Sequence, residues 1–225
     1  MSLFLKFKKM IEVINVNKSF DGNHVLKHVS AVFESGKTNM IIGASGSGKT
    51  VLMKSIIGLH RIDSGRIMYD GRNLPDMRMN EIRTLRREVG MLFQGSALFD
   101  SLSVLENVMY PLEMFSNMSK DEMLERARYC LDHVDLKEFS FGLPPSEISG
   151  GMQKRVAIAR AIVLQPKYLF CDEPNSGLDP QTSLIIDRLI HDITQEFNIT
   201  TIINSHDMNS VMEIGENIIF INKGI

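Results

Sequence analysis

Residues 38–50 read TNMIIGASGSGKT, an apolar run followed by a glycine-rich loop that ends in Lys49 and Thr50. The loop fits G-x-x-x-x-G-K-[ST], a pattern whose glycines let successive backbone N–H groups point at phosphate oxygens. It predicts that Lys49 reaches the β- and γ-phosphates of a nucleotide and that the Thr50 hydroxyl binds Mg²⁺. A loop that binds nothing would not require a strand before it and helical spacing after it, through Ile57. The phosphate-binding residues of this first cradle are therefore predicted to be Gly43, Ala44, Ser45, Gly46, Ser47, Gly48, Lys49 and Thr50.

Strand-like and helical stretches alternate on both sides of this loop. A helical pattern covers residues 180–197. Runs with strand composition cover residues 11–16, 28–33, 65–71, 89–94, 167–173, 199–206 and 217–222. Apolar strands interleaved with helices predict an α/β fold with a mostly parallel sheet.

Residues 102–145 interrupt this alternation with two helical stretches, Val104–Phe115 and Lys120–His133, and no strand pattern between them. We interpret them as a helical subdomain inserted into the core. The chain is then one domain over residues 1–225, with its core formed by residues 1–101 and 146–225.

The composition narrows the classes of function. A chain of 225 residues with net charge −2 is long enough for a well-buried domain and has no broad basic surface for nucleic acid. Cys130 and Cys171 match no metal or redox spacing, and we interpret them as reduced thiols of an intracellular protein.

No apolar run approaches the roughly 20 residues that span a bilayer. Residues 1–10 mix Leu, Phe and Lys, and we expect either a disordered leader or, in part, a cloning remnant, rather than a membrane-surface segment.

Two adjacent carboxylates follow the apolar run at Tyr168–Phe170. At the end of a strand, Asp172 would hold Mg²⁺, usually through water, and Glu173 would polarise a water that attacks the γ-phosphate. An isolated Asp-Glu pair is common on surfaces. The upstream phosphate loop and the following PNSGLDP, residues 174–180, make this pair a strong signal.

A second anion site is predicted at residues 147–162, which read EISGGMQKRVAIARAI. A Ser-Gly-Gly turn running into a helix leaves backbone N–H groups free to bind an anion. Together with the first cradle, this motif makes residues 10–222 resemble the ATP-binding cassette family, whose signature motif is commonly LSGGQ. Met152 stands where that motif has Gln, and Ile148 stands where it has Leu.

The resemblance implies a P-loop NTPase fold of ABC-ATPase type, with a mostly parallel core sheet, an N-terminal antiparallel β region and an inserted helical subdomain. It also implies that Ser149, Gly150 and Gly151, the second cradle, close over the γ-phosphate held by a second, head-to-tail copy of the chain. Two-fold symmetry makes this arrangement self-consistent, since each copy gives one half-site and receives the other.

The other landmarks of the family follow in order along the chain. By this resemblance Phe20 stacks on adenine, and Gln94 contacts Mg²⁺ and takes part in catalysis. Asp179 lies in the loop that meets the partner copy, and His206 bonds to the γ-phosphate. ATP and Mg²⁺ are therefore the expected substrate and cofactor, and the expected reaction is ATP hydrolysis coupled to transport.

Residues 94–113, QGSALFDSLSVLENVMYPLE, indicate which transport process ATP hydrolysis would drive. This segment resembles ATPases of Mla-type phospholipid transport systems, whose partners contain MCE domains. The resemblance implies permease subunits in the membrane, an MCE-domain partner, and a cytoplasmic location on the inner face of the cell membrane. It implies no nucleic-acid partner.

Three alternatives stay open. Cassette ATPases for amino acids or lipoprotein release share part of the same segment. Some cassette ATPases do not take part in transport. Those of repair proteins contain long coiled coils, and this chain has no heptad run. Those of ribosome-associated proteins join two cassettes in one chain, whereas this chain has one. A regulatory module without hydrolysis would not need the Asp172-Glu173 pair and His206.

Overall fold

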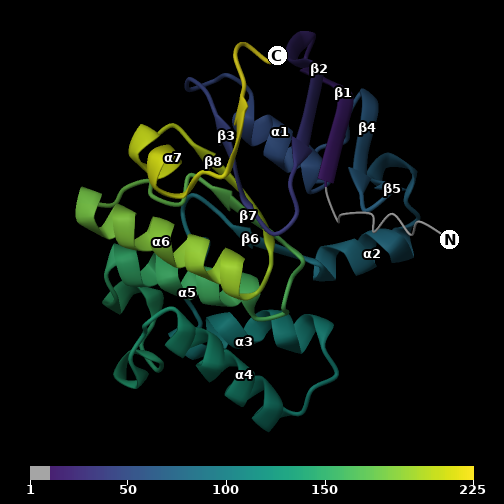
Figure 1. Cartoon of the computed structure of the whole chain (residues 1–225). Coiled ribbons are helices and arrows are strands. Elements are labelled where there is room, and N and C mark those ends of the chain that lie inside the picture. The colour runs from purple at the N-terminus through teal and green to yellow at the C-terminus, as the bar shows by residue number, and fades with distance from the viewer. Residues whose placement is uncertain (1–10) are drawn as a thin grey trace, which may run out of the picture.

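The computed structural model describes residues 11–225, so the expectations for residues 1–10 lie outside it. Two sheets form its framework (Figure 1). An antiparallel sheet has the order β2-β1-β4-β5, from Asn23–Phe33, Ile11–Phe20, Ser64–Tyr69 and Arg72–Asn73. A parallel sheet has the order β6-β7-β8-β3-β9, from Val89–Leu92, Tyr168–Asp172, Thr200–Ser205, Thr38–Ile42 and Asn217–Phe220. The predicted fold class is confirmed.

The parallel sheet is covered on both faces, which explains its apolar strands. All five residues of β7 are buried, and side chains alternate between the faces of a strand. Tyr168 and Phe170 pack into one core, while Leu169 and Cys171 pack into another on the opposite face.

Helix α1, Lys49–Ile56, lies between the two sheets (Figure 1). Its buried residues Leu52, Met53 and Ile56 share a core with residues of the antiparallel sheet and of β7. This packing on both sides fixes the N-terminus of α1 directly after β3, where the glycine-rich loop is.

The inserted stretch forms α3, Val104–Phe115, and α4, Lys120–His133, at the end of the molecule far from the antiparallel sheet (Figure 1). Each begins with a capping box, in which a serine and the glutamate three residues later bond to each other's backbone N–H. Their apolar side chains join the core that covers one face of the parallel sheet. Helix α5, Gly150–Ile162, packs against both helices and connects them to that sheet.

Helix α6, Pro180–Glu196, agrees with the predicted helical pattern. Two further helices were not predicted: α2, Met79–Arg87, and α7, Met208–Ile214. Only one residue of α2 is buried and α7 has only seven residues, so each has too few apolar residues to stand out in the sequence. Strand β6 is also shorter than predicted, because it ends at Leu92 and leaves Gln94 in the following loop.

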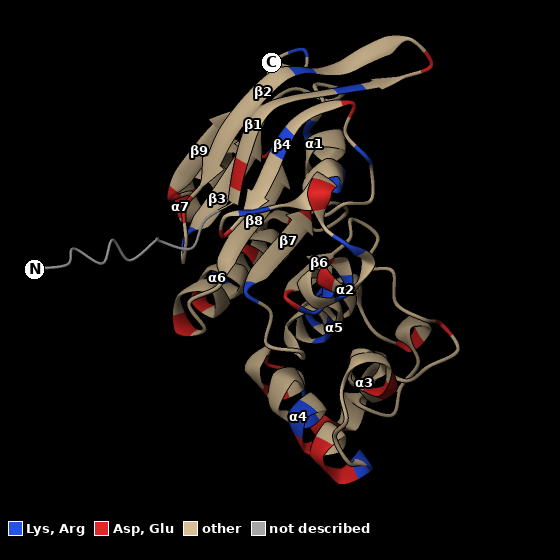
Figure 2. Cartoon of the chain, turned by 90° about the vertical axis from the view of Figure 1, so that its right-hand side faces the viewer, with Lys and Arg blue, Asp and Glu red and all other residues tan. Residues whose placement is uncertain are grey.

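Acidic and basic residues are interspersed along α2 and α4 in Figure 2. Within residues 11–225, no helix has the length and apolar character needed to cross a membrane.

Candidate active site

The predicted catalytic segments meet at one edge of the parallel sheet. The carboxyl ends of β3, β7 and β8 lie side by side there, as is general for ligand sites in α/β folds. They surround a cavity of about 420 Å³, a volume typical of small-molecule sites. Its lining includes Ser45, Gly46, Gly48, Lys49 and Thr50 of the first cradle, with Gln94, Glu173 and His206 from three other segments.

Two glycines show how the first cradle is built. A β-carbon at Gly43 would lie 2.2 Å from the carbonyl oxygen of Ile221, so only glycine fits against that strand end. A β-carbon at Gly46, whose φ is +75°, would meet nothing within 4 Å and would instead fill the space in which a phosphate fits. The hydroxyl of Ser47 is buried without a hydrogen-bond partner. Open space, an unpartnered hydroxyl and the N-terminus of α1 together suit an anionic ligand.

Lys49 is held in place by the loop that precedes it. Its Nζ donates to the carbonyl oxygens of Gly43 at 2.9 Å and Ala44 at 3.2 Å, and the residue is 7% exposed. An ammonium group has three donors and rotates freely. It can therefore exchange these carbonyls for phosphate oxygens without moving its backbone.

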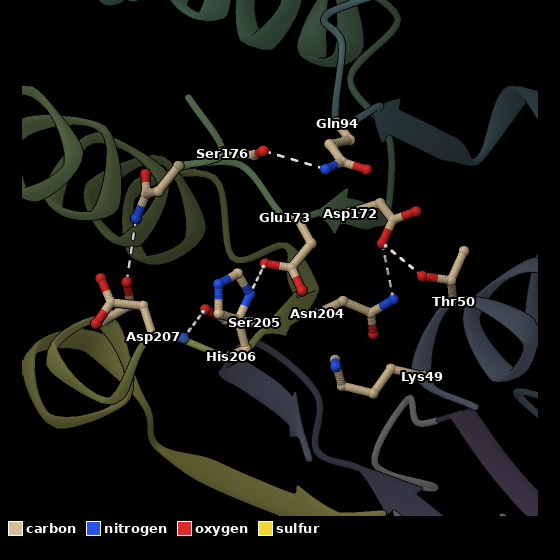
Figure 3. Close-up of polar contacts among 12 residues, drawn as sticks. Lys49, Thr50, Gln94, Asp172, Glu173, Ser176, Asn204, Ser205, His206 and Asp207 are labelled. Carbon is tan, nitrogen blue, oxygen red and sulfur yellow. Dashed lines mark hydrogen bonds and ion pairs between the residues drawn. The ribbon is translucent and has the colours of Figure 1, made fainter. Parts of the chain in front are cut away.

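Thr50 lines the cavity and Asp172 does not, but Thr50 Oγ1 donates to Asp172 Oδ1 at 3.3 Å (Figure 3). Asn204 Nδ2 donates to the same carboxylate oxygen at 3.0 Å. Mg²⁺ prefers hard oxygen ligands, and in nucleotide sites it takes one or two from the protein and the rest from phosphate and water. Thr50 and Asp172 fit that demand, and a set of three or more His, Cys, Asp or Glu ligands is absent from residues 11–225.

Asn204 was not predicted. Its signal in the sequence was a polar residue close to the end of the apolar strand β8, one strand away from Asp172.

Glu173 and His206 form a direct pair in Figure 3, with 2.8 Å between Glu173 Oε2 and His206 Nδ1. Glu173 has a left-handed φ of +49°, which is strained for a residue with a β-carbon. Its backbone N–H donates to the carbonyl oxygen of Asn204 at 3.1 Å, which fixes that conformation. The carboxylate thereby points into the cavity, where it can accept a proton from a water molecule.

Gln94 reaches the same cavity from the loop after β6. Its Nε2 donates to Ser176 Oγ at 3.1 Å, in the segment that follows Glu173 (Figure 3). The Gln94 amide therefore bonds to the segment that carries Glu173.

Phe20 lies at the end of β1 and is 38% exposed. His60 packs edge-on against its ring at 5.2 Å, and Lys18 Nζ lies 4.9 Å from the ring centre. Phe20 is not among the residues that line the cavity, and Val25 of β2, which was not predicted, lines it beside the first cradle.

The second cradle lies in a separate cavity of about 460 Å³. Ser149 caps α5 by accepting from the N–H of Met152, and Gly150 and Gly151 form the first turn. Asp179 lines the same cavity and caps the N-terminus of α6. Hydrogen bonds to its carboxylate, chiefly from the Thr182 side chain and backbone N–H, keep the pKa of this carboxyl below its ordinary value. Met152 packs against the apolar core and also lines this second cavity.

The segment between the two cavities is anchored by a buried carboxyl group. Asn175 Nδ2 donates to Asp187 Oδ1 of α6 at 2.8 Å and to Ser210 Oγ of α7 at 3.0 Å. Burial raises the pKa of Asp187, Asp207 and Glu213 add to the rise, and the bonds from Ser210 and Asn175 oppose it.

Replacing Asp187 with Asn is expected to stabilise the chain at neutral pH by about 1 kcal/mol. Because the pKa of Asp187 is raised above 3.8, the folded chain binds this proton more tightly than the unfolded chain. The contribution of the carboxyl therefore falls as the pH rises above that value, and Asn removes the buried charge. Thermal unfolding between pH 4 and 8 should show a Tm gain that shrinks toward low pH. Asp192→Asn, on the exposed side of α6, is the control and should show no such trend.

Comparisons with known proteins find relatives along most of the chain. The family model described as ABC transporter matches residues 26–176. The chain is 40% identical over 216 residues to the methionine import ATP-binding protein MetN of Clostridium acetobutylicum, covering 96% of this chain and 67% of that protein. It is 39% identical over 215 residues to the glutamine transport ATP-binding protein GlnQ of Escherichia coli, covering 96% and 88%. It is 36% identical over 211 residues to the probable ribonucleotide transport ATP-binding protein mkl of Mycobacterium leprae, covering 92% and 59%.

Solved structures share the fold over nearly the whole chain. The dimeric structure of MJ0796, described as a bacterial ABC transporter cassette, has a TM-score of 0.87 and 34% identity, and covers 96% of this chain and 95% of that one. A dimeric post-hydrolysis state of MJ0796 bound to ADP and Pi has a TM-score of 0.86, 33% identity and the same coverage. The chain spans only about 59–67% of the length of the MetN and mkl proteins.

Proposed function

Since this chain belongs to the ABC transporter family, we propose that it is the ATP-hydrolysing subunit of a membrane transporter and works as a head-to-tail pair. The observation that carries this proposal is the separation of the two cradles. Ser149, Gly150 and Gly151 share no cavity with Lys49 and Thr50. One nucleotide in one chain cannot use both cradles, whereas two chains related by a two-fold axis can use all four.

The proposed chemistry uses residues of the first cavity together with Asp172 and Phe20, which lie outside its lining. Lys49 binds the β- and γ-phosphates, Thr50 and Asp172 would hold Mg²⁺, and Phe20 stacks on adenine. Mg²⁺, when bound, would neutralise charge that develops on the phosphates. Glu173 accepts the proton of the attacking water.

Two further side chains complete this site. His206 and Gln94 donate hydrogen bonds on the γ-phosphate side, and His206 leaves Glu173 to do so. Placing such donors where charge develops is what lowers the barrier to phosphoryl transfer.

The segment at residues 102–145 acts, in this proposal, as the helical subdomain that receives the membrane subunit. The end of α3 and the loop before it leave large apolar side chains exposed, among them Phe99, Tyr110, Met114 and Phe115. The Phe99 and Tyr110 rings pack 4.7 Å apart and form a platform for a short permease helix. The chain would then sit on the inner face of the cell membrane, held there by permease subunits.

Two cargo classes are compatible with this role. The names of the relatives favour a small polar solute, since they specify methionine, glutamine or ribonucleotide transport. Residues 94–113 favour phospholipid and an MCE-domain partner, by resemblance to Mla-type ATPases. We place the small polar solute first, because no relative named above is a phospholipid transporter.

Purifying the assembled transporter through a tag on this chain, and identifying its bound small molecules by mass spectrometry, separates the two classes. A bound amino acid or nucleotide supports the first class. Bound phospholipid with a co-purified MCE-domain protein supports the second class.

The head-to-tail pair is tested by mass in solution. The hydrolysis-deficient variant Glu173→Gln should shift from one 25.4 kDa chain to twice that mass when ATP and Mg²⁺ are added. Light scattering measures the shift directly.

Gly150→Asp in the same background is the matched control. A β-carbon at Gly150 makes only an ordinary contact, 3.8 Å from Leu178, and an acidic residue suits the first turn of a helix. The added carboxylate should repel the γ-phosphate of the partner's nucleotide. This variant should therefore bind ATP and stay monomeric, and a dimer with unchanged affinity would contradict the shared site.

A further inference from the structure

Helix α5 connects the two cavities. Its first turn forms the second cradle, and two of its cationic side chains reach the loop that carries Gln94. Lys154 Nζ donates to the carbonyl oxygen of Gln94. Arg160 Nη2 and Nη1 donate to the carbonyl oxygens of Ser96 at 2.7 Å and Ala97 at 2.8 Å.

Lys154 is an unusual residue at this place. It is 4% exposed, and within residues 11–225 no carboxylate forms an ion pair with it. Burial lowers the pKa of its ammonium group, partly offset by the nearby Cys171 of β7. A buried ammonium without a carboxylate is costly, so its place in the core calls for a role beyond packing.

The loop that it contacts does not hold its shape by local preference. Ser96 and Ala97 have φ values of +61° and +48°, a left-handed conformation that residues with a β-carbon avoid. Two successive residues of this kind persist only where surrounding contacts impose them. Arg160 of α5 donates to the carbonyl oxygens of both residues, and Lys154 holds Gln94 just before them. Two turn hydrogen bonds within the loop, from the N–H groups of Ser96 and Ala97 to the carbonyl oxygens of Phe93 and Gly95, add to these contacts.

We propose that Lys154 is a positioning residue that couples the two cradles by fixing the backbone of Gln94 to the helix that begins at Ser149. The inference rests on the proposed head-to-tail function. When the second cradle closes on the partner's nucleotide, a displacement of α5 reaches Gln94 directly through Lys154 Nζ, whereas Arg160 transmits it only to Ser96 and Ala97. Binding at one half-site thereby sets the catalytic geometry at the other.

The competing explanation is a structural role, in which Lys154 only stabilises the core. Arg126 supplies the comparison, because it also donates to backbone carbonyls of this region, those of Ile162 and Val163 at the far end of α5. Within residues 11–225, the hydrogen bonds of Arg126 go to these two carbonyls and not to the Gln94 loop. Arg126→Met should therefore lower stability without changing that loop.

The experiment is a double-mutant cycle between Lys154→Met and Gln94→Ala, read by steady-state ATP hydrolysis. Lys154→Met should lower kcat about ten-fold, with the KM for ATP within about two-fold, and Lys154→Arg should restore most of the loss. In the Gln94→Ala background, Lys154→Met should cause less than a two-fold further loss. Equal losses in both backgrounds would overturn the proposal. If Lys154→Met does not fold, Lys154→Gln keeps a shorter donor and replaces it in the cycle.

Hydrogen exchange of the peptide covering residues 93–99, without nucleotide, is the second readout. Lys154→Met should speed exchange there, whereas Arg126→Met should not, and unchanged exchange in Lys154→Met would also overturn the proposal. A wild-type chain that hydrolyses no ATP would refute the proposed function instead, and the exchange result would still report on the contact between Lys154 and the loop.

Discussion

Replacing Glu173 with Gln is expected to reduce ATP hydrolysis by at least about 100-fold while leaving ATP affinity nearly unchanged. The substitution keeps the shape and the hydrogen bond to His206 but removes the group that accepts the proton of water. In the proposed function Lys49 and Thr50 bind the nucleotide, whereas the Glu173 carboxylate pairs with His206. Phosphate release and ATP titration, each measured on the same preparation, separate the two effects.

Glu173→Asp is the informative companion to that variant. It retains the charge but shortens the side chain, which would lengthen the 2.8 Å contact with His206. An intermediate rate is expected, because the base remains but is misplaced. Wild-type turnover in Glu173→Gln would show that another group accepts the proton.

Replacing Lys49 with Ala is expected to weaken ATP binding by about 2–3 kcal/mol, roughly 30- to 150-fold in Kd. The loss is expected because the ammonium would supply charged hydrogen bonds to the phosphates, and Lys49 is the only lysine or arginine among the described residues that line the first cavity. Isothermal titration calorimetry of the nucleotide, in the presence of Mg²⁺, measures the change.

Lys49→Arg controls for charge alone. Its planar guanidinium cannot occupy the place between the Gly43 and Ala44 carbonyls in the same way, so we expect it to restore only part of the affinity. An unchanged Kd in Lys49→Ala would remove the first cradle from nucleotide binding, whatever the outcome for Glu173.

The parts of the site that the sequence predicted are those in which local chemistry and chain order coincide. Lys49 and Thr50 follow a glycine loop between a strand and a helix, and Asp172 and Glu173 end a strand that is apolar throughout. Parallel strands bring their carboxyl ends to one edge of the sheet. The order of the elements along the chain is therefore enough to predict that these residues lie close together.

The parts that could not be predicted depend on contacts between distant segments. Asn204 acts on Asp172 only because β8 pairs with β7, and Lys154 reaches Gln94 across 60 positions of the chain. Helix α2 escaped prediction for another reason: its polar residues face solvent, and only Leu85 is buried. A sequence pattern predicts which residues are buried and where turns occur. It does not predict which polar groups from distant segments bond to each other.

The burial of both cysteines has a practical consequence for labelling chemistry. Burial raises the pKa of the Cys130 thiol to about 11 and that of Cys171 further, so neither presents a thiolate to a reagent at neutral pH. Thiols introduced into the two cradles, by Ser45→Cys and Gly150→Cys, would therefore react while the two native cysteines do not. An oxidant would join them between copies only when the copies meet head to tail, and the native cysteines would need no replacement.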